Sequence, residues 1–277
     1  MQYLVRDKKK IPELRDLWSL KRGEITAVVG AGGKTSTMNI LAREFKFSRV
    51  IYTTTTAVLL PENIPCRFKV VDSAEDLQGA VERYKNVSHQ NNPGRVLVVG
   101  KKLIPAHPGS RAKKKLIGLE KRWLNSLVGK LSNIKVLVEA DGANSHRVKA
   151  PAEYEPVIPN ESSNLIVIQG GSALGRKLHS PHCFRAKLIK ANFKYADVKK
   201  RINFKLYQQL FVGRPGYGRY IHKFPNSRLV LTQCNRSLFR FCRRFDRELV
   251  NNYSDRVEGL TALNYNSLPE IIYHSSY

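Results

Sequence analysis

A glycine-rich stretch near the start of the chain combines the residue types that bind a polyphosphate. It reads Gly30, Ala31, Gly32, Gly33, Lys34, Thr35 and Ser36. Glycines allow successive backbone N–H groups to point at a phosphate, and a helix that begins here adds positive potential. Lys34 would neutralise the β- and γ-phosphates, and the Thr35 hydroxyl would bind Mg²⁺. This phosphate loop, residues 30–36, predicts binding of ATP or GTP with Mg²⁺; a plain glycine turn between a strand and a helix is the alternative.

The spacing of the phosphate loop narrows the comparison with known nucleotide-binding motifs. The pattern is G-x-G-G-K-T, and Val28 stands where G-x-x-x-x-G-K-[ST] places its first glycine. The shorter G-x-x-G-K-[ST] loop of Mur-type ligases is therefore the closer match. This spacing leaves a second hypothesis open, in which the protein is a ligase or kinase that transfers the γ-phosphate to a carboxylate or a hydroxyl.

Two acidic residues follow a hydrophobic run later in the chain. The run at residues 134–138 delivers Glu139 and Asp141 at its carboxyl end, and side-chain alternation along a strand places both on the same side. Carboxylates beside a phosphate loop can hold Mg²⁺ or orient an attacking water molecule. We expect Lys34, Glu139 and Asp141 to be catalytic. The two carboxylates and Thr35 would hold the metal ion, while a solvated Asp-Gly turn is the alternative interpretation.

Four consecutive threonines supply a further candidate. Residues 53–56 follow the apolar run 50–52, again at the carboxyl end of a predicted strand. Hydroxyls there could bind the nucleotide or Mg²⁺, and Thr54 and Thr55 are the candidates. Threonine is also a common strand residue, so a structural role is equally open.

The chain alternates apolar runs of strand length with helix-like stretches, which is typical of α/β proteins. The predicted strands are 25–29, 50–52, 68–71, 96–99, 134–138, 165–168 and 229–231. The predicted helices are 12–20, 35–44, 74–84, 119–127, 204–211 and 238–251. Near-continuous Val, Ile and Leu runs suit a mostly parallel sheet with helices on both faces, and such sheets bind ligands at the carboxyl ends of their strands. We therefore predict a three-layer α/β fold like that of the P-loop NTPases.

Length and composition indicate how the chain is organised. Its 277 residues, with 42% hydrophobic side chains, are enough for one domain with a buried core. We expect a single P-loop NTPase-like domain over residues 1–277, and the more basic and aromatic composition over 176–277 makes a C-terminal lobe the alternative. The N-terminal charges argue against a secretory signal, and no run approaches about 18 apolar residues. The sequence thus predicts no membrane span and a cytoplasmic location.

Basic residues dominate the charge. Forty-eight Lys and Arg against 22 Asp and Glu give a formal net charge of +26 at pH 7. Clusters lie at residues 8–10, 111–115, 199–201 and 243–244. Such a field attracts nucleic acid, anionic lipid or phosphorylated ligands. A solvated basic surface is the favoured interpretation, and a nucleic-acid-binding protein with a vestigial nucleotide site is the alternative.

The order and spacing of these motifs resemble the YqeC family over roughly residues 23–190. The matching segments are GAGGKTS, the threonine run 53–56, VEADGA, KAPAEYEPVIP at 149–159, GGSALG at 170–175 and HCFR at 182–185. Members of the family are accessory proteins of selenium-dependent molybdenum hydroxylases. The resemblance implies a nucleotide-dependent step in making or inserting a selenium-containing form of the molybdenum hydroxylase cofactor. Our first hypothesis is a nucleoside triphosphatase, an accessory enzyme that hydrolyses ATP or GTP in this step. That cofactor or its client hydroxylase would be the partner, and the reaction itself is not implied.

The resemblance also implies further site residues. It places Lys149 among the catalytic residues. It places Glu153, Glu155 and Arg185 among those that bind the nucleotide. Taken alone, the segment 149–159 is a proline-braced loop whose charges could lie on the surface. Where relatives tend to have an N-K-x-D-like strand end, this chain has LTQCN at 231–235, which leaves the choice between ATP and GTP open.

Overall fold

The computed structural model describes nine stretches of the chain. They are residues 12–45, 48–61, 64–86, 95–109, 113–179, 181–193, 201–224, 226–265 and 269–277. The basic run 8–10 lies outside the described residues, as do 111–112 and 199–200 of two other basic runs.

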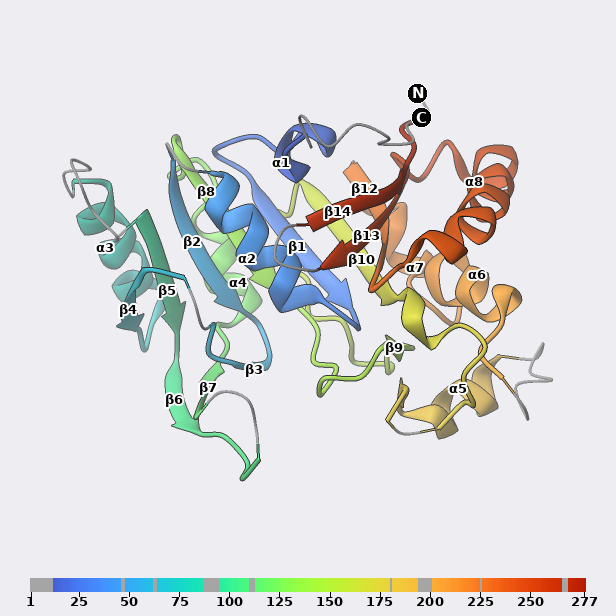
Figure 1. Ribbon diagram of the computed structural model, residues 1–277. Helices are drawn as coiled ribbons and strands as arrows, with labels where there is room; N and C mark the ends of the chain where they lie inside the picture. The colour runs from blue at the N-terminus through green and yellow to red at the C-terminus, as the bar shows by residue number, and fades with distance from the viewer. Residues whose placement is uncertain are drawn as a thin grey trace.

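Within the described residues, nine strands form one sheet at the centre of the protein (Figure 1). Their order across the sheet is β14-β13-β12-β10-β1-β8-β2-β5-β4. The strands are β1 (Ile25–Gly30), β2 (Arg49–Thr54), β4 (Cys66–Val70), β5 (Val96–Gly100), β8 (Ile134–Glu139), β10 (Asn164–Gly170), β12 (Asn226–Thr232), β13 (Leu260–Tyr265) and β14 (Pro269–His274). Neighbours are parallel except β13 and β14, which pair antiparallel. All seven predicted strands are present in this sheet.

Helices cover both faces of the sheet. They are α1 (Leu14–Leu17), α2 (Lys34–Glu44), α3 (Ala74–Lys85), α4 (Lys121–Asn125), α5 (Ala186–Asn192), α6 (Phe204–Val212), α7 (Gly218–Ile221) and α8 (Phe239–Tyr253). Successive side chains of a strand point to opposite faces, and β1 shows the result. Ala27 and Val29 belong to an apolar cluster with residues of α3, α4, α6 and α8, whereas Val28 belongs to a cluster with residues of α1 and α2. The predicted three-layer α/β fold with a mostly parallel sheet is confirmed.

Several elements differ from the sequence predictions. The predicted helix 12–20 is shorter, because Ser19 has a φ of 51° that no α-helix continues through. The helix predicted over 119–127 is also limited to α4. Strands β13 and β14 and helices α5 and α7 were not predicted. Neither were two small sheets, one of β3 (Ala57–Leu59), β7 (Lys114–Ile117) and β6 (Lys102–Pro105), the other of β9 (Val148–Lys149) and β11 (Cys183–Phe184).

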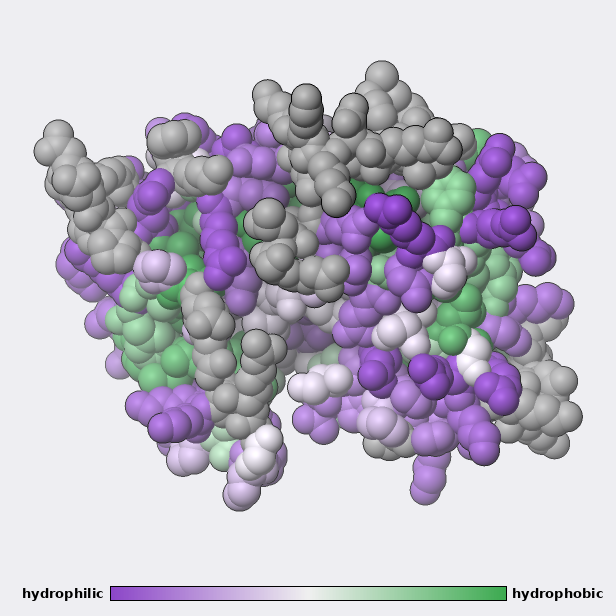
Figure 2. Space-filling view, in the orientation of Figure 1, coloured by the Kyte–Doolittle hydropathy of each residue, from purple (hydrophilic) through white to green (hydrophobic). Residues whose placement is uncertain are grey.

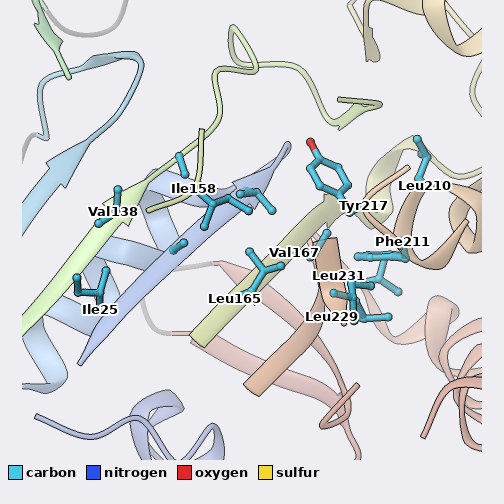
Figure 3. Packing of buried hydrophobic residues seen from close by; sticks show 14 of the residues in the cluster. Ile25, Val138, Ile158, Leu165, Val167, Leu210, Phe211, Tyr217, Leu229 and Leu231 are labelled. Carbon is cyan, nitrogen blue, oxygen red and sulfur yellow. The ribbon is translucent and has the colours of Figure 1, made fainter. Parts of the chain in front are cut away.

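The larger apolar cluster gives the centre of the sheet a rigid base. Val138, Ile25, Val167 and Leu229 come from the neighbouring strands β8, β1, β10 and β12, and Figure 3 shows them with Tyr217 in one packed group. Each is at most 1% exposed. Burying one such side chain contributes roughly 1.5–3 kcal/mol, so the strand ends that carry the candidate site are held in place by the core.

The C-terminal part of the chain contributes to the same sheet. Strands β12, β13 and β14 extend it on the far side of β10, and α8 packs on β13 and β14. Among the residues that the structure describes, no helix has both the length and the apolar character needed to cross a membrane.

Candidate functional site

Parallel pairing brings the predicted motifs to one edge of the sheet. Strands β10, β1, β8 and β2 are adjacent, and the register pairs Glu139 with Val28 on one side and with Thr54 on the other. The phosphate loop follows β1 directly. Because the carboxyl ends of parallel strands lie at the same edge, the loop, the acidic strand end and the threonine run become neighbours.

Steric crowding requires glycine at key positions of the phosphate loop. Gly30, Gly32 and Gly33 have φ values of 97°, 79° and 138°, which other residues rarely adopt. A Cβ at Gly30 would overlap the Ile168 carbonyl oxygen, and one at Gly32 would overlap the carbonyl oxygen of Arg147. The loop therefore packs backbone to backbone against the end of β10.

The backbone of the loop offers N–H groups to a ligand. Ala31 donates its N–H to the Ile168 carbonyl at 2.8 Å. The next amides, from Gly32 to Thr35, precede or begin the first turn of α2, where helical geometry supplies no carbonyl partner. Together with the positive end of the helix they form a cradle suited to an anion.

Lys34 lies folded over the loop rather than in solvent. Its ammonium donates to the Gly30 carbonyl oxygen at 2.8 Å and lies 3.5 Å from Oε1 of Glu139. The side chain is only 5% exposed. A buried ammonium held by one carbonyl and one carboxylate is placed to exchange that carbonyl for phosphate oxygens without leaving the loop.

Thr35 and Glu139 face each other across the gap between α2 and β8. The Thr35 hydroxyl donates to Oε2 of Glu139 at 3.1 Å. Burial raises the pKa of Glu139, while the Lys34 ammonium and the Thr35 hydroxyl act in the opposite direction. An added cation would favour the ionised form of this carboxylate.

These two side chains fit Mg²⁺ that is shared with a phosphate. Mg²⁺ prefers oxygen ligands and binds through one or two carboxylates together with water and phosphate oxygens. Among the described residues, no group of three or more His, Cys, Asp or Glu is arranged to hold a metal ion. The donor set therefore suits a metal that arrives with a nucleotide, not one caged by protein side chains alone.

Asp141 has a different place from the one predicted. It is fully buried, and its Oδ2 accepts the Gly30 N–H at 3.2 Å and the hydroxyl of Tyr217. Its Oδ1 accepts a hydrogen bond from Lys149. Both oxygens thus have hydrogen-bond donors inside the protein, and the bond from Gly30 ties Asp141 to the phosphate loop.

Lys149 continues this network away from the loop. Its buried ammonium bonds to Asp141 and lies 2.8 Å from Oε2 of Glu155. Arg185 binds both oxygens of Glu155, and its Nη2 lies 3.2 Å from Oε1. Burial raises the pKa of Glu155, but the hydrogen bonds from Lys149 and Arg185 outweigh it, so the pKa lies below its ordinary value. The predicted residues Lys149, Glu155 and Arg185 thus form a chain of charges that holds the loop through Asp141.

Four other predicted residues are not hydrogen-bond or ion-pair partners of the Lys34 ammonium. Ser36 and Glu153 are exposed, and Glu153 is not part of the charge network. The Thr54 hydroxyl donates to the Glu139 carbonyl at 2.6 Å, and the Thr55 hydroxyl donates to the Val157 carbonyl at 2.6 Å. These two hydrogen bonds join β2 to β8 and to the segment 149–159, which favours the structural interpretation of the threonine run.

Three residues that the sequence analysis did not select complete the network. Tyr217 donates to Asp141, and Figure 3 shows its ring within the packed core. Tyr220 donates its hydroxyl to the Glu155 carbonyl at 2.6 Å, and Arg219 donates to the Ala152 carbonyl at 2.9 Å. The turn from α6 into α7 therefore fastens both the phosphate loop and the segment 149–159.

The sequence carries only a weak signal for this turn. Gly216 and Gly218 lie so close to α6 that a Cβ would overlap the carbonyl oxygens of Gln209 and Val212. Glycines beside tyrosines indicate a tight turn that packs on something, but no spacing rule connects the turn to an acidic strand end 76 residues earlier.

The fold and the site together define a class of protein. It is a three-layer α/β protein in which β1 runs into a phosphate loop, and the lysine and hydroxyl of the next helix face a carboxylate on the neighbouring strand. This chain belongs to the YqeC family. The family, described as YqeC protein, matches residues 26–187, which is more than half of the chain. The resemblance found in the sequence is confirmed.

Two further similarities accompany the family match. The chain is 31% identical over 176 residues to the protein named uncharacterized protein YqeC of Escherichia coli (strain K12). That match covers 61% of this chain and 60% of the relative, so it spans less than two thirds of either. The structure of pNOB8 ParA bound to nonspecific DNA aligns with 84% of this chain and 78% of its own, at 18% identity and a TM-score of 0.37.

Proposed function

We propose that this chain binds ATP or GTP together with Mg²⁺ at the phosphate loop and hydrolyses it. The observation that carries the proposal is the arrangement of Lys34, Thr35 and Glu139. A buried ammonium lies 3.5 Å from the carboxylate, and the hydroxyl lies 3.1 Å from its second oxygen, directly beside the amides of the loop. A structural glycine turn would have no need of a buried lysine at this position.

Each residue has a defined part in the proposed reaction. The amides from Gly32 to Thr35 bind the β-phosphate oxygens, and Lys34 moves its hydrogen bond from the Gly30 carbonyl to the phosphates. Thr35 and Glu139 would hold the metal ion, and Glu139 is also the group placed to orient a water molecule. Bound Mg²⁺ supplies charge neutralisation on the β- and γ-phosphates. Phosphoryl transfer is catalysed mainly by such positioning and charge neutralisation.

The Asp141 network sets the position of the loop in this scheme. Asp141 fixes the Gly30 amide, and Lys149, Glu155 and Arg185 fix Asp141 in turn. We therefore assign Lys149 a positioning role. The carboxylate of Glu155 and the guanidinium of Arg185 lie at the outer end of the network, where a second substrate would meet it.

Family membership supports a more specific role. We place the reaction in the cytoplasm, in the maturation of a selenium-dependent molybdenum hydroxylase, with the cofactor or the client hydroxylase as the partner. This assignment depends on the resemblance to the YqeC family and not on the geometry of the site. The acceptor of the γ-phosphate is water in this proposal, as opposed to the carboxylate or hydroxyl of a Mur-like ligase or kinase.

Calorimetric titration with ATP and GTP in the presence of Mg²⁺ tests the proposal. The Lys34→Ala variant should lose binding, while Lys121→Ala, which removes an exposed lysine at the start of α4, should bind like the unaltered protein. Circular dichroism of both variants checks the fold. Equal binding by the unaltered protein and Lys34→Ala would contradict the proposal, and a phosphorylated acceptor in place of free phosphate would reassign the reaction to a ligase or kinase.

A further inference from the structure

Helix α8 carries a stripe of arginines on its outer face. Arg240, Arg243, Arg244 and Arg247 are all exposed. At about 100° per residue, these four positions fall within an arc of about 100° on the helix surface. Between Arg240 and Arg247 the stripe extends about 10.5 Å along the axis, at 1.5 Å per residue.

The opposite face of α8 is buried in the core. Cys242, Phe245 and Leu249 are each 0% exposed and belong to the larger apolar cluster. Asp246 is also buried, and it accepts hydrogen bonds from the hydroxyls of Tyr273, Ser275 and Tyr277. Its negative charge is therefore held inside the protein, on the side away from the arginines.

The arginine stripe is not neutralised by neighbouring carboxylates. Among the described residues, Arg236, just before α8, pairs with Glu270, but no ion pair joins Arg240, Arg243, Arg244 or Arg247 to an acidic side chain. The Arg244 guanidinium lies 4.5 Å from the centre of the Phe204 ring, which holds it on the surface while leaving its charge unpaired. In Figure 2, hydrophilic side chains lie at the outer edge of the molecule where Figure 1 places α8, with hydrophobic atoms beside them.

We propose that this arginine stripe binds the phosphodiester backbone of a nucleic acid. Arginine presents a planar fork of donors that matches phosphate oxygens, and phosphate contacts supply most of the affinity of sequence-independent binding. One nucleic-acid strand carries a phosphate about every 3.4 Å of axis, so a stripe of about 10.5 Å meets several phosphates at once. The net charge of +26 attracts the same partner from a distance.

A lipid surface fits the stripe less well. A helix that inserts into a lipid surface needs a free apolar face, and here that face is packed in the core. Helix α8 also lies outside residues 26–187, the segment that matches the YqeC family.

Fluorescence anisotropy with labelled duplex DNA, duplex RNA and single strands, across a salt series, tests the proposal. The test variant replaces the four arginines with glutamine: Arg240→Gln, Arg243→Gln, Arg244→Gln and Arg247→Gln. A matched control removes the same charge from exposed lysines elsewhere: Lys102→Gln, Lys113→Gln, Lys114→Gln and Lys121→Gln. Nucleotide titration and thermal unfolding of both variants show that each still folds.

The two variants should differ clearly in the salt dependence of nucleic-acid binding. The logarithm of the binding constant falls linearly with the logarithm of the salt concentration, and each lost phosphate contact makes this slope less steep by about 0.9. The slope of the α8 variant should therefore be about 3 to 4 less steep than that of the unaltered protein, and the slope of the control should change much less. Equal loss in both variants would show that bulk charge is responsible and would overturn the proposal, as would no binding by the unaltered protein. Binding to polyglutamate or to phosphatidylserine vesicles that matches or exceeds binding to every nucleic acid would overturn it too. The Lys34→Ala variant should keep nucleic-acid binding, so failure of the nucleotide site can be distinguished.

Discussion

The hydroxyl of Tyr217 donates to the same carboxylate oxygen of Asp141 that accepts the backbone N–H of Gly30. One atom thus joins the turn between α6 and α7 to the first residue of the phosphate loop. Because Tyr217 and Asp141 are both fully buried, neither group can exchange this partner for water. The position of the loop is therefore coupled to a part of the chain that follows it by almost two hundred residues.

Replacing this tyrosine should affect both stability and ligand binding. Tyr217→Phe removes one hydrogen bond to a buried carboxylate and should lower the free energy of unfolding by about 1–3 kcal/mol. It should also weaken binding of the nucleotide, because the Gly30 amide is held less firmly. Tyr273→Phe is a matched control, since Tyr273 donates to the buried carboxylate of Asp246 at 2.7 Å, away from the loop. Urea unfolding and nucleotide titration of both variants give the result; a similar loss of nucleotide affinity in both would remove the special role of Tyr217.

The Asp141 and Lys149 pair should behave as one unit. Asp141→Asn leaves a buried ammonium with less compensation, and breaking such a pair costs about 3–5 kcal/mol. Adding Lys149→Met removes that ammonium, so the double variant should be more stable than the sum of the two single changes predicts. A double-mutant cycle by urea unfolding measures the coupling. Additive effects would mean that the ion pair does not stabilise the folded protein in the way described.

Thr35 should matter for the metal ion more than for the fold. Its hydroxyl bonds to Glu139 at the surface of the cradle, so Thr35→Ala should reduce the gain in nucleotide affinity that Mg²⁺ provides by about tenfold, or about 1.4 kcal/mol. Thr35→Ser keeps the hydroxyl and should behave like the unaltered protein. Titrations with and without Mg²⁺ separate the effects. If serine and alanine give the same result, the hydroxyl has no part in metal binding.

His274 should make the stability depend on pH. Burial lowers its pKa from 6.5 to about 4, and the charge of Arg228 adds to the effect. Its Nδ1 lies 3.0 Å from the hydroxyl of Thr261, which itself accepts the indole N–H of Trp18, so the neutral ring is the form that completes the chain of hydrogen bonds.

The folded protein therefore binds this proton less readily than the unfolded chain. The stability from His274 is present above pH 6.5 and is lost as the pH falls toward 4, by up to about 3 kcal/mol. His274→Gln should flatten the unfolding free energy in this window, whereas exposed His222→Gln should leave the profile unchanged. The same slope in all three proteins would show that His274 is not the group responsible.

Local patterns in the sequence were enough to predict most of the sheet and to select three residues of the candidate site that lie together. Most of the seven predicted strands are near-continuous apolar runs, as expected for strands covered on both faces, although the edge strand β4 is largely exposed. Lys34, Thr35 and Glu139 could be selected because a glycine loop next to a helix start and an acidic end of an apolar run are short-range signals, and the structure places the three side chains together. Because β1 and β8 are parallel neighbours, their carboxyl ends lie together at one edge of the sheet.

The surroundings of Asp141 could not be predicted, because its hydrogen-bond partners are distant in the sequence. Alternation along β8 suggested that Asp141 would share the role of Glu139, yet the charges around it come from Lys149 and the hydroxyl from Tyr217. Only tertiary packing decides which oxygens of a carboxylate remain free. Short helices such as α5 and α7 have too few residues for a periodic pattern to be recognised.

The C-terminal strands bind the phosphate loop as well. Thr232 at the end of β12 donates to the Gly32 carbonyl, and the hydroxyl of Tyr265 in β13 shares a hydrogen bond with Thr37 of α2. During synthesis the loop leaves the ribosome long before these residues exist, so the cradle stays without its outer supports until β12 and β13 have been made. A nascent chain that carries only the family-matched segment should not yet hold nucleotide firmly, and tight binding would signal that translation has passed β13.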